Sequence, residues 1–458
     1  MPRVRGARCC TALQNDPERA PGRCRLSRSI TRMSVRAPPR GRVLHRPAAL
    51  ACVLAALAPA AGAQQSQPDP GAPGMTGLDG PYAMSREGSG TSWQPDSTPM
   101  SGLHAMRGAW MTMIHGHAVL IYDDQGGPRG ATQSFSTSML MFMARRELSD
   151  GAFGLRVMAS TDPLMGKSGY PLLFQTGETA NGRDPLIDRQ HPHDLLMEAA
   201  ATYSLNLSPH SSLFAYAGLP GEPALGPNAF MHRLSGMDEP EAPLSHHWLD
   251  STHISWGVVT GGYTWKALRL EASAFNGREP DQNRYNIEAR SLDSYAARVS
   301  YNPTRDWSLQ GSFGRLASPE QLQPGVSVRR STASASYSAP LGRWWQTTLA
   351  WGRNAPSAGP ASDAWLLESA LNLARAHTLF GRLERVAKDE LFLPGAALHG
   401  RSFTINKLSL GYIRDFAHLG ALDLGLGGLI STYSYPSTLN AVYGSGPTSF
   451  MVFVRARL

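Results

Sequence analysis

The sequence predicts an all-β protein, an antiparallel transmembrane β-barrel of about 16 strands within a range of 14–18. Three observations predict this fold. Apolar and polar residues alternate along many short segments between residues 108 and 458, the connections between these segments are alternately short and long, and only 17% of the residues are charged. About a quarter of a soluble domain is usually charged. No segment after the leader contains 18 uninterrupted apolar residues, so a helical membrane protein is not expected.

Residues 1–63 have the pattern of a leader with a signal peptide. The first 46 residues contain 12 Arg against one Asp and one Glu, and an apolar run follows at 48–58. Small residues at 61–63 then form a cleavage site of the kind that precedes a secreted chain. We expect cleavage after Ala63, and Met33 is a second candidate for the start of translation.

The leader also accounts for the net charge of +8 and for all four cysteines. The remaining residues carry 31 basic and 33 acidic side chains, which excludes a nucleic-acid partner. With every Cys before residue 53, the mature chain has no disulfide framework, thiolate metal site or Cys nucleophile. No motif fixes a catalytic serine, and phosphate-loop, dinucleotide and HExxH signatures are missing from the sequence, so we expect no enzyme.

Residues 64–107 are rich in Gln, Ser, Pro, Gly and Asp and have almost no apolar periodicity. At 64–74 this composition is typical of a flexible linker, whereas Trp93 and several Met at 76–106 favour packing of part of that stretch. We expect a flexible periplasmic segment, of which 80–106 is a candidate for a plug that folds back into the barrel.

The predicted barrel, residues 108–458, begins with a strand from Trp110 to Tyr122 whose alternate residues form one apolar face. The same alternation recurs at 153–160, 197–206, 268–274, 295–301, 345–351, 422–426 and 450–458. Period-2 alternation places each apolar set on one face of a strand. Many stripes span 9–11 residues with Trp or Tyr at their ends, which suits a tilted membrane-crossing strand with interfacial aromatic residues. In the segment at 422–426, we expect Leu424 and Leu426 in lipid and Asp423 and Gly425 in the lumen.

The connections alternate in length. Short ones lie at 149–151, 208–210 and 302–304, and long ones at 161–192, 220–252, 277–291 and 387–401. Outer-membrane barrels have short periplasmic turns and long extracellular loops, and an even number of strands places both termini in the periplasm.

The final strand, Ser449–Leu458, resembles the C-terminal strand of bacterial outer-membrane β-barrels of the porin-like kind, although it ends in Leu458 where those proteins usually end in an aromatic residue. Residues 122–129 and 188–194 resemble segments of a group of uncharacterised bacterial outer-membrane proteins. The resemblance implies localisation in the cell outer membrane, with membrane lipid and the barrel-assembly machinery as partners. It implies no particular activity.

Methionine is concentrated early in the barrel. Of the 15 Met residues after position 63, 11 lie between Met75 and Met165. Two adjacent strands carry Met and His on the face opposite the lipid stripe, at Met111, Met113, His115, His117, Met139, Met141 and Met143. Thioethers suit Cu(I) and imidazoles suit either copper state, so this track is a candidate copper or silver site. The alternative is packing without metal, because Met fills irregular gaps, and a one-residue slip would turn the second set toward lipid.

Charges of both signs also fall on predicted lumen positions, at Arg156, Glu198, Arg269, Glu271, Arg298, Arg382, Glu384, Arg455 and Arg457. They either orient solutes at a constriction or form a ladder of cross-strand ion pairs. The long loops contain further histidines at 191, 193, 232, 246, 247 and 253. We expect them to be solvated, with a metal site as the alternative, because their spacing matches no specific zinc motif.

The leading functional hypothesis is a channel or transport protein for small solutes or ions. The alternative is a copper- or silver-binding outer-membrane protein that uses the Met/His track. Copper is the only cofactor that the sequence suggests.

Overall fold

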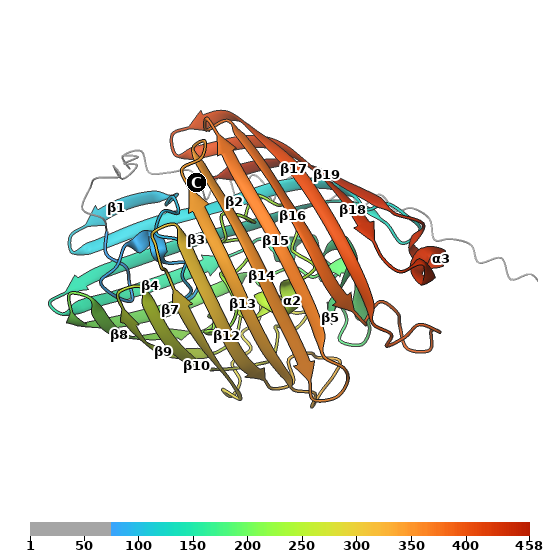
Figure 1. Cartoon of the computed structure of the whole chain (residues 1–458), viewed down its shortest axis with the longest axis horizontal. Coiled ribbons are helices and arrows are strands. Elements are labelled where there is room, and N and C mark those ends of the chain that lie inside the picture. The colour runs from blue at the N-terminus through green and yellow to red at the C-terminus, as the bar shows by residue number, and fades with distance from the viewer. Residues whose placement is uncertain (1–74) are drawn as a thin grey trace, which may run out of the picture. The chain divides into compact units, whose positions relative to one another are not determined.

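A closed antiparallel barrel forms the body of the computed structural model, which describes residues 75–458 (Figure 1). Its sheet has 17 strands, of which β1 (Leu103–Arg107) pairs only with β2, so 16 strands form the ring. They are β2 (Trp110–Asp124), β3 (Thr132–Leu148), β4 (Gly151–Ala159), β7 (Leu196–Ser208), β8 (Ser211–Gly218), β9 (Val258–Trp265), β10 (Leu268–Phe275), β11 (Ser294–Tyr301), β12 (Trp307–Leu316), β13 (Val328–Ala339), β14 (Trp344–Pro356), β15 (Ser362–Leu373), β16 (His377–Lys388), β17 (Phe403–Leu419), β18 (Leu422–Ser434) and β19 (Thr448–Arg457). The predicted fold class and strand number are confirmed. The expected signal peptide, the cleavage after Ala63 and the start at Met33 lie outside the described residues.

The ring closes where the last strand meets the first. β19 pairs with residues 117–124 of β2, and β1 pairs with residues 110–114 of the same edge. Between them, the backbone N–H of Leu458 donates to the carbonyl of Gly116 at 2.9 Å. Because this edge of β2 is covered along its length, the backbone groups are paired within the sheet, as a hydrocarbon environment requires.

The connections alternate as the sequence predicts. Short turns join the strands at one end, which we call the turn end, and longer connections join them at the other, the loop end. The loop end carries the remaining elements: η2 (Asp162–Met165), β5 (Tyr170–Thr179), β6 (Pro185–Gln190), α2 (His246–Leu249), η3 (Ser251–His253), η4 (Ser437–Leu439) and α3 (Asn440–Tyr443). The segment before β1 contains η1 (Met84–Arg86). Within residues 75–458, no helix has the length and apolar character needed to cross a membrane.

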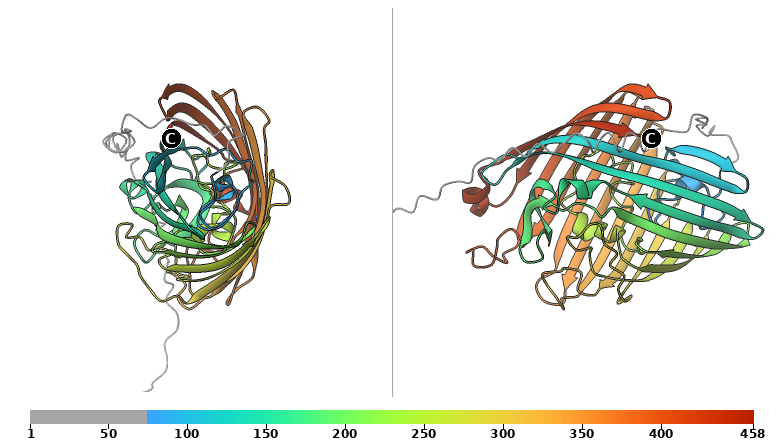
Figure 2. Two further views of the ribbon diagram at one scale, coloured as in Figure 1. Left: turned by 90° about the vertical axis from the view of Figure 1, so that its left-hand side faces the viewer. Right: turned by 180° about the vertical axis from the view of Figure 1, so that it is seen from behind.

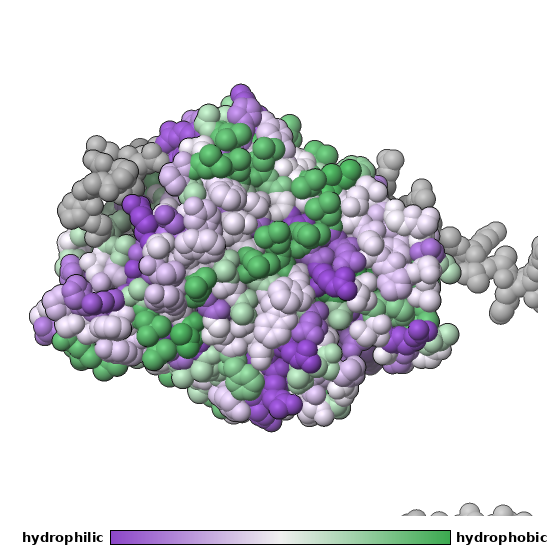
Figure 3. Space-filling view, viewed as in Figure 1, coloured by the Kyte–Doolittle hydropathy of each residue, from purple (hydrophilic) through white to green (hydrophobic). Residues whose placement is uncertain are grey.

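The outer face of the wall is apolar and the inner face is polar. On β10, Leu270 is 46% exposed, whereas its neighbours Arg269 and Glu271 are buried. Apolar side chains spread over the outer surface in Figure 3. Aromatic residues form a band near each end, with Trp307 against Tyr337 toward the turn end and Tyr122 against Phe450 toward the loop end. This exterior is that of a membrane-spanning barrel.

The predicted strand faces hold, with one correction. On β18, Leu426 is exposed and Gly425 is buried, as expected. On β7, however, the alternation at 197–206 puts Met197 in the outward-facing apolar set, and it is instead fully buried among other methionines. The pairing register shifts between Met158 and Ala159 of β4, opposite this point, and breaks the alternation.

An arginine on the lipid face tests the membrane assignment. Leu426→Arg lies in the central part of β18, where a cationic side chain should cost about 2–4 kcal/mol of unfolding free energy. Leu419→Arg, at the turn end of β17, should cost about 0–1 kcal/mol because its side chain reaches the interface. Urea titration of the barrel refolded in lipid vesicles measures both. A substitution at Gly425, on the inner face, would be a poor control, because an added Cβ there would lie 2.5 Å from Asp415 Oδ1 and would destabilise the wall by itself. Equal penalties at Leu426 and Leu419 would contradict a membrane-spanning wall.

Candidate functional site

Two parts of the chain lie inside the ring of strands, as the views in Figure 2 show. One is the segment of residues 75–101, which precedes β1, and we call it the N-segment. The other is the connection of residues 219–257 between β8 and β9, which contains α2 and η3, and we call it the inner loop. Both are hydrogen-bonded to inward-facing side chains of the wall, and both therefore occupy part of the lumen.

The inner loop is held by a buried charge network. Arg233 forms ion pairs with Asp250 of the same loop and with Glu368 of β15, both at 2.7 Å. Burial would raise the pKa of the Asp250 carboxyl, but the Arg233 guanidinium beside it holds that pKa below its ordinary value. Arg382 of β16 reaches Glu239 at 3.0 Å and Glu368 at 3.3 Å. The loop therefore supplies carboxylates that compensate cations of the wall.

Other inner-loop contacts continue this pattern around the ring. Glu384 of β16 accepts hydrogen bonds from the backbone N–H and the hydroxyl of Ser245, at 2.9 and 2.8 Å. Lys407 of β17 pairs with Glu241, and Arg455 of β19 pairs with Asp238. The inner loop is thus anchored to strands on several sides of the lumen.

The N-segment contacts a different part of the wall. Arg269 of β10 pairs with Asp79 at 3.1 Å and stacks over the ring of Trp93. Arg298 of β11 donates to the hydroxyl of Thr91 at 3.0 Å. These contacts place the N-segment against β10 and β11.

The nine predicted lumen charges all point inward, at Arg156, Glu198, Arg269, Glu271, Arg298, Arg382, Glu384, Arg455 and Arg457. Some cross-strand pairs are present, such as Arg298 with Glu271 at 2.9 Å. Most of the remaining partners belong to the N-segment or the inner loop. The predicted ladder of cross-strand pairs therefore describes only part of the network, and pairs with the N-segment and the inner loop make up the rest.

The Met/His track lies on the lumen side, as predicted. β2 and β3 pair so that Met113, His115 and His117 stand directly opposite Met143, Met141 and Met139. Met111 stands opposite Arg145. Both strands therefore present these residues to the lumen, and the methionines of β3 do not face lipid.

Side chains that the sequence did not single out complete this cluster. Met158, Met197 and Met231 pack with the methionines of β3. The Nε2 atom of His115 lies 3.2 Å from Met141 Sδ, and the Nε2 atom of His232 lies 3.2 Å from Met158 Sδ. The two imidazole rings are 5.8 Å apart. We call His115, Met141, Met158 and His232 the His–Met cluster; its thioether and imidazole groups are ligands that suit copper or silver.

The expectation that the loop histidines are solvated is wrong. His246 and His253 are at most 4% exposed, and their rings lie 5.2 Å apart. His193 follows at 5.3 Å from His253. Burial lowers the pKa of His253 to about 3 and also lowers that of His246, so both imidazoles are neutral at pH 7. They are buried because the inner loop folds into the lumen instead of extending into solvent.

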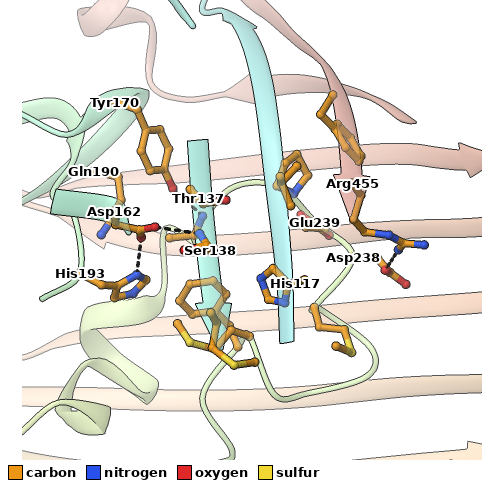
Figure 4. Close-up of a pocket in the computed structure, with 18 of the residues that line it drawn as sticks. His117, Thr137, Ser138, Asp162, Tyr170, Gln190, His193, Asp238, Glu239 and Arg455 are labelled. Atoms are coloured by element: carbon orange, nitrogen blue, oxygen red, sulfur yellow. Dashed lines mark hydrogen bonds and ion pairs between the residues drawn. The ribbon is translucent and has the colours of Figure 1, made fainter. Parts of the chain in front are cut away.

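A cavity lies beside His193, between β2, β3, β19 and the inner loop (Figure 4). His117 of β2 and Arg455 of β19 line one side, and His193 lines another. The Asp162 carboxylate accepts from the Ser138 backbone N–H at 2.9 Å and lies 2.8 Å from His193 Nδ1, an interaction that orients the ring. The cavity thus combines imidazoles, thioethers and paired charges.

Sequence comparison identifies no relative: no family model and no curated protein matches the chain. Solved structures do match in fold. OmpF of Salmonella typhi, in a complex with daunomycin, has a TM-score of 0.50 at 9% identity and covers 78% of this chain and 100% of its own. The anion-selective porin of Comamonas acidovorans has a TM-score of 0.48 at 11% identity, covering 76% and 100%. OprB of Pseudomonas putida has a TM-score of 0.47 at 8% identity and covers 76% of this chain and 93% of its own. The likeness to OmpF supports the porin-like outer-membrane fold and nothing finer.

The charge network predicts a large effect of removing its central cation. Arg233→Met removes the 2.7 Å partner of both Asp250 and Glu368 and leaves Glu368 with only its longer ion pair to Arg382, so it should cost about 3–5 kcal/mol of unfolding free energy. Arg353→Met breaks a pair in which both side chains are more than one-third exposed, and should cost about 0–1 kcal/mol. Urea titration in lipid vesicles compares the two. Similar small losses would mean that the inner loop does not dock on β15.

Proposed function

We propose that this outer-membrane barrel is a channel or transport protein for small solutes or ions, with no catalytic role, and that the N-segment and the inner loop narrow its lumen. The proposal rests on one observation, a closed ring of 16 strands whose inner face is lined with charged and polar side chains. Barrels of this strand number enclose an aqueous lumen. Charges along the path would orient a solute and select among ions.

The N-segment is the proposed plug. Arg269 and Arg298 contact the Asp79 carboxylate, the Thr91 hydroxyl and the Thr91 carbonyl of this segment, and the segment's backbone adds no strand to the ring. Such a segment is removable without opening the sheet.

Deleting residues 76–101 should therefore raise the single-channel conductance in planar lipid bilayers, because the lumen beside β10 and β11 is vacated. β1 stays intact in this deletion, so the covered edge of β2 is kept. Arg353→Met is the matched control and should conduct like the unaltered chain. A deletion variant that folds and conducts no more than the unaltered chain would reject the plug.

A second candidate function, binding of copper or silver, is favoured by the His–Met cluster. Two His–Met contacts of 3.2 Å face each other across 5.8 Å between the imidazole rings. Soft monovalent ions prefer such ligands. The competing reading is a packed core, since five methionines of this region are buried together.

Titration with Cu(I) distinguishes metal binding from packing. The folded barrel in detergent should bind Cu(I) under reducing conditions, and the double variant Met141→Leu/Met158→Leu should bind at least about tenfold more weakly, as Leu keeps the volume and removes the sulfur. Met106→Leu, at a side chain that is 70% exposed, is the control. Unchanged affinity in the double variant would leave packing as the role of the cluster.

A further inference from the structure

Three side chains from three separate connections converge at the loop end. His247 belongs to α2 of the inner loop, Glu279 to the connection between β10 and β11, and Glu320 to the connection between β12 and β13. One nitrogen or oxygen atom of each lies within 4.8 Å of the other two. These residues lie outside the His–Met cluster and take no part in the charge network that anchors the inner loop.

The converging atoms lack partners. His247 Nε2 and Glu279 Oε2 are buried, and neither atom takes part in a hydrogen bond within residues 75–458. Both residues are less than one-tenth exposed, at 8% and 7%. The other oxygen of Glu279 accepts from Ser251 Oγ at 3.1 Å, which fixes the carboxylate and leaves its second oxygen without a partner. A buried polar atom without a partner is costly, so a ligand that satisfies both atoms would stabilise this part of the barrel.

The carboxyl groups of Glu279 and Glu320 also have no ion-pair partner within the described part of the chain. The nearby guanidinium of Arg330 is engaged with Ser251 Oγ and Asn354 Oδ1, each at 3.0 Å. Two carboxylates therefore meet an imidazole with no cation of the protein paired to them. A bound cation would supply the missing charge.

We propose that His247, Glu279 and Glu320 form a binding site for a divalent transition-metal ion of the Zn²⁺ class. An imidazole with two carboxylates is a ligand set that zinc accepts, with water in the fourth position. Calcium is a poorer match because it takes only oxygen ligands. Tetrahedral zinc bonds of about 2.0–2.2 Å place ligand atoms about 3.4 Å apart, and the three atoms lie within 4.8 Å of one another here, so binding would draw them together.

The site has a mechanical consequence. His247 lies on the inner loop, whereas Glu279 and Glu320 lie on connections at the mouth of the barrel. A bound ion would join the loop that narrows the lumen to the loops around its entrance. The site thus goes beyond the proposed transport function, and its existence does not depend on that function.

Isothermal titration tests the proposal on the full chain, folded in detergent and freed of metal with a chelator. Zn²⁺ should bind, and the double variant Glu279→Gln/Glu320→Gln should bind at least about tenfold more weakly, since the amides keep the shape and remove the charge. Glu147→Gln, at a side chain that is 73% exposed, is the matched control and should bind like the unaltered chain. Met141→Leu/Met158→Leu should also leave Zn²⁺ binding unchanged, which separates this site from the His–Met cluster.

Thermal unfolding gives a second measurement for the same variants. Zn²⁺ should raise the unfolding midpoint of the unaltered chain and of Glu147→Gln, and should not raise that of the double variant. No Zn²⁺ binding by the folded chain, or equal binding in the Glu279→Gln/Glu320→Gln variant, would overturn the proposal. Tighter binding of Ca²⁺ than of Zn²⁺ would overturn the assigned class of ion.

Discussion

The hydrogen bonds between β19 and β2 are the interaction on which the rest of the structure depends. A sheet in hydrocarbon has no water to satisfy an open edge, so it must close on itself. Once it is closed, the two faces of each strand have different surroundings. Leucine and aromatic residues face lipid, and Arg, Glu, Ser and Thr side chains of the same strands face inward. The polar interior follows directly from closure.

A polar interior in turn requires partners. Arg269, Arg298 and Arg382 are almost completely buried, and an unpaired buried charge is strongly unfavourable. Part of the compensation comes from neighbouring strands, and the N-segment and inner loop supply the rest through residues such as Asp79 and Glu239. The segments that occupy the lumen and the charges of the wall therefore stabilise one another. Transport through this barrel would require some of these contacts to be exchanged for contacts with solute or water.

The sequence predicts what depends on local periodicity. The inward face of Met139 and the outward face of Leu426 both follow from alternation within one strand. Contacts between distant positions leave no such pattern: Arg233 and Glu368 are 135 positions apart, and no periodicity links them. The buried loop histidines were missed for this reason. Met197 was missed because a register irregularity is invisible to a strict period of two.

Docking of the inner loop on the wall is the central claim, and a disulfide tests it most directly. Ser235 Oγ of the inner loop lies 2.8 Å from Thr348 Oγ1 of β14, and both residues are buried. In a chain whose leader cysteines are replaced by serine, Ser235→Cys/Thr348→Cys should form an intramolecular disulfide on mild oxidation in lipid vesicles, detected by mass spectrometry. Near-complete disulfide formation is the expected result. Two free thiols that a water-soluble reagent labels rapidly, in a barrel that has folded, would contradict an inner loop docked in the lumen.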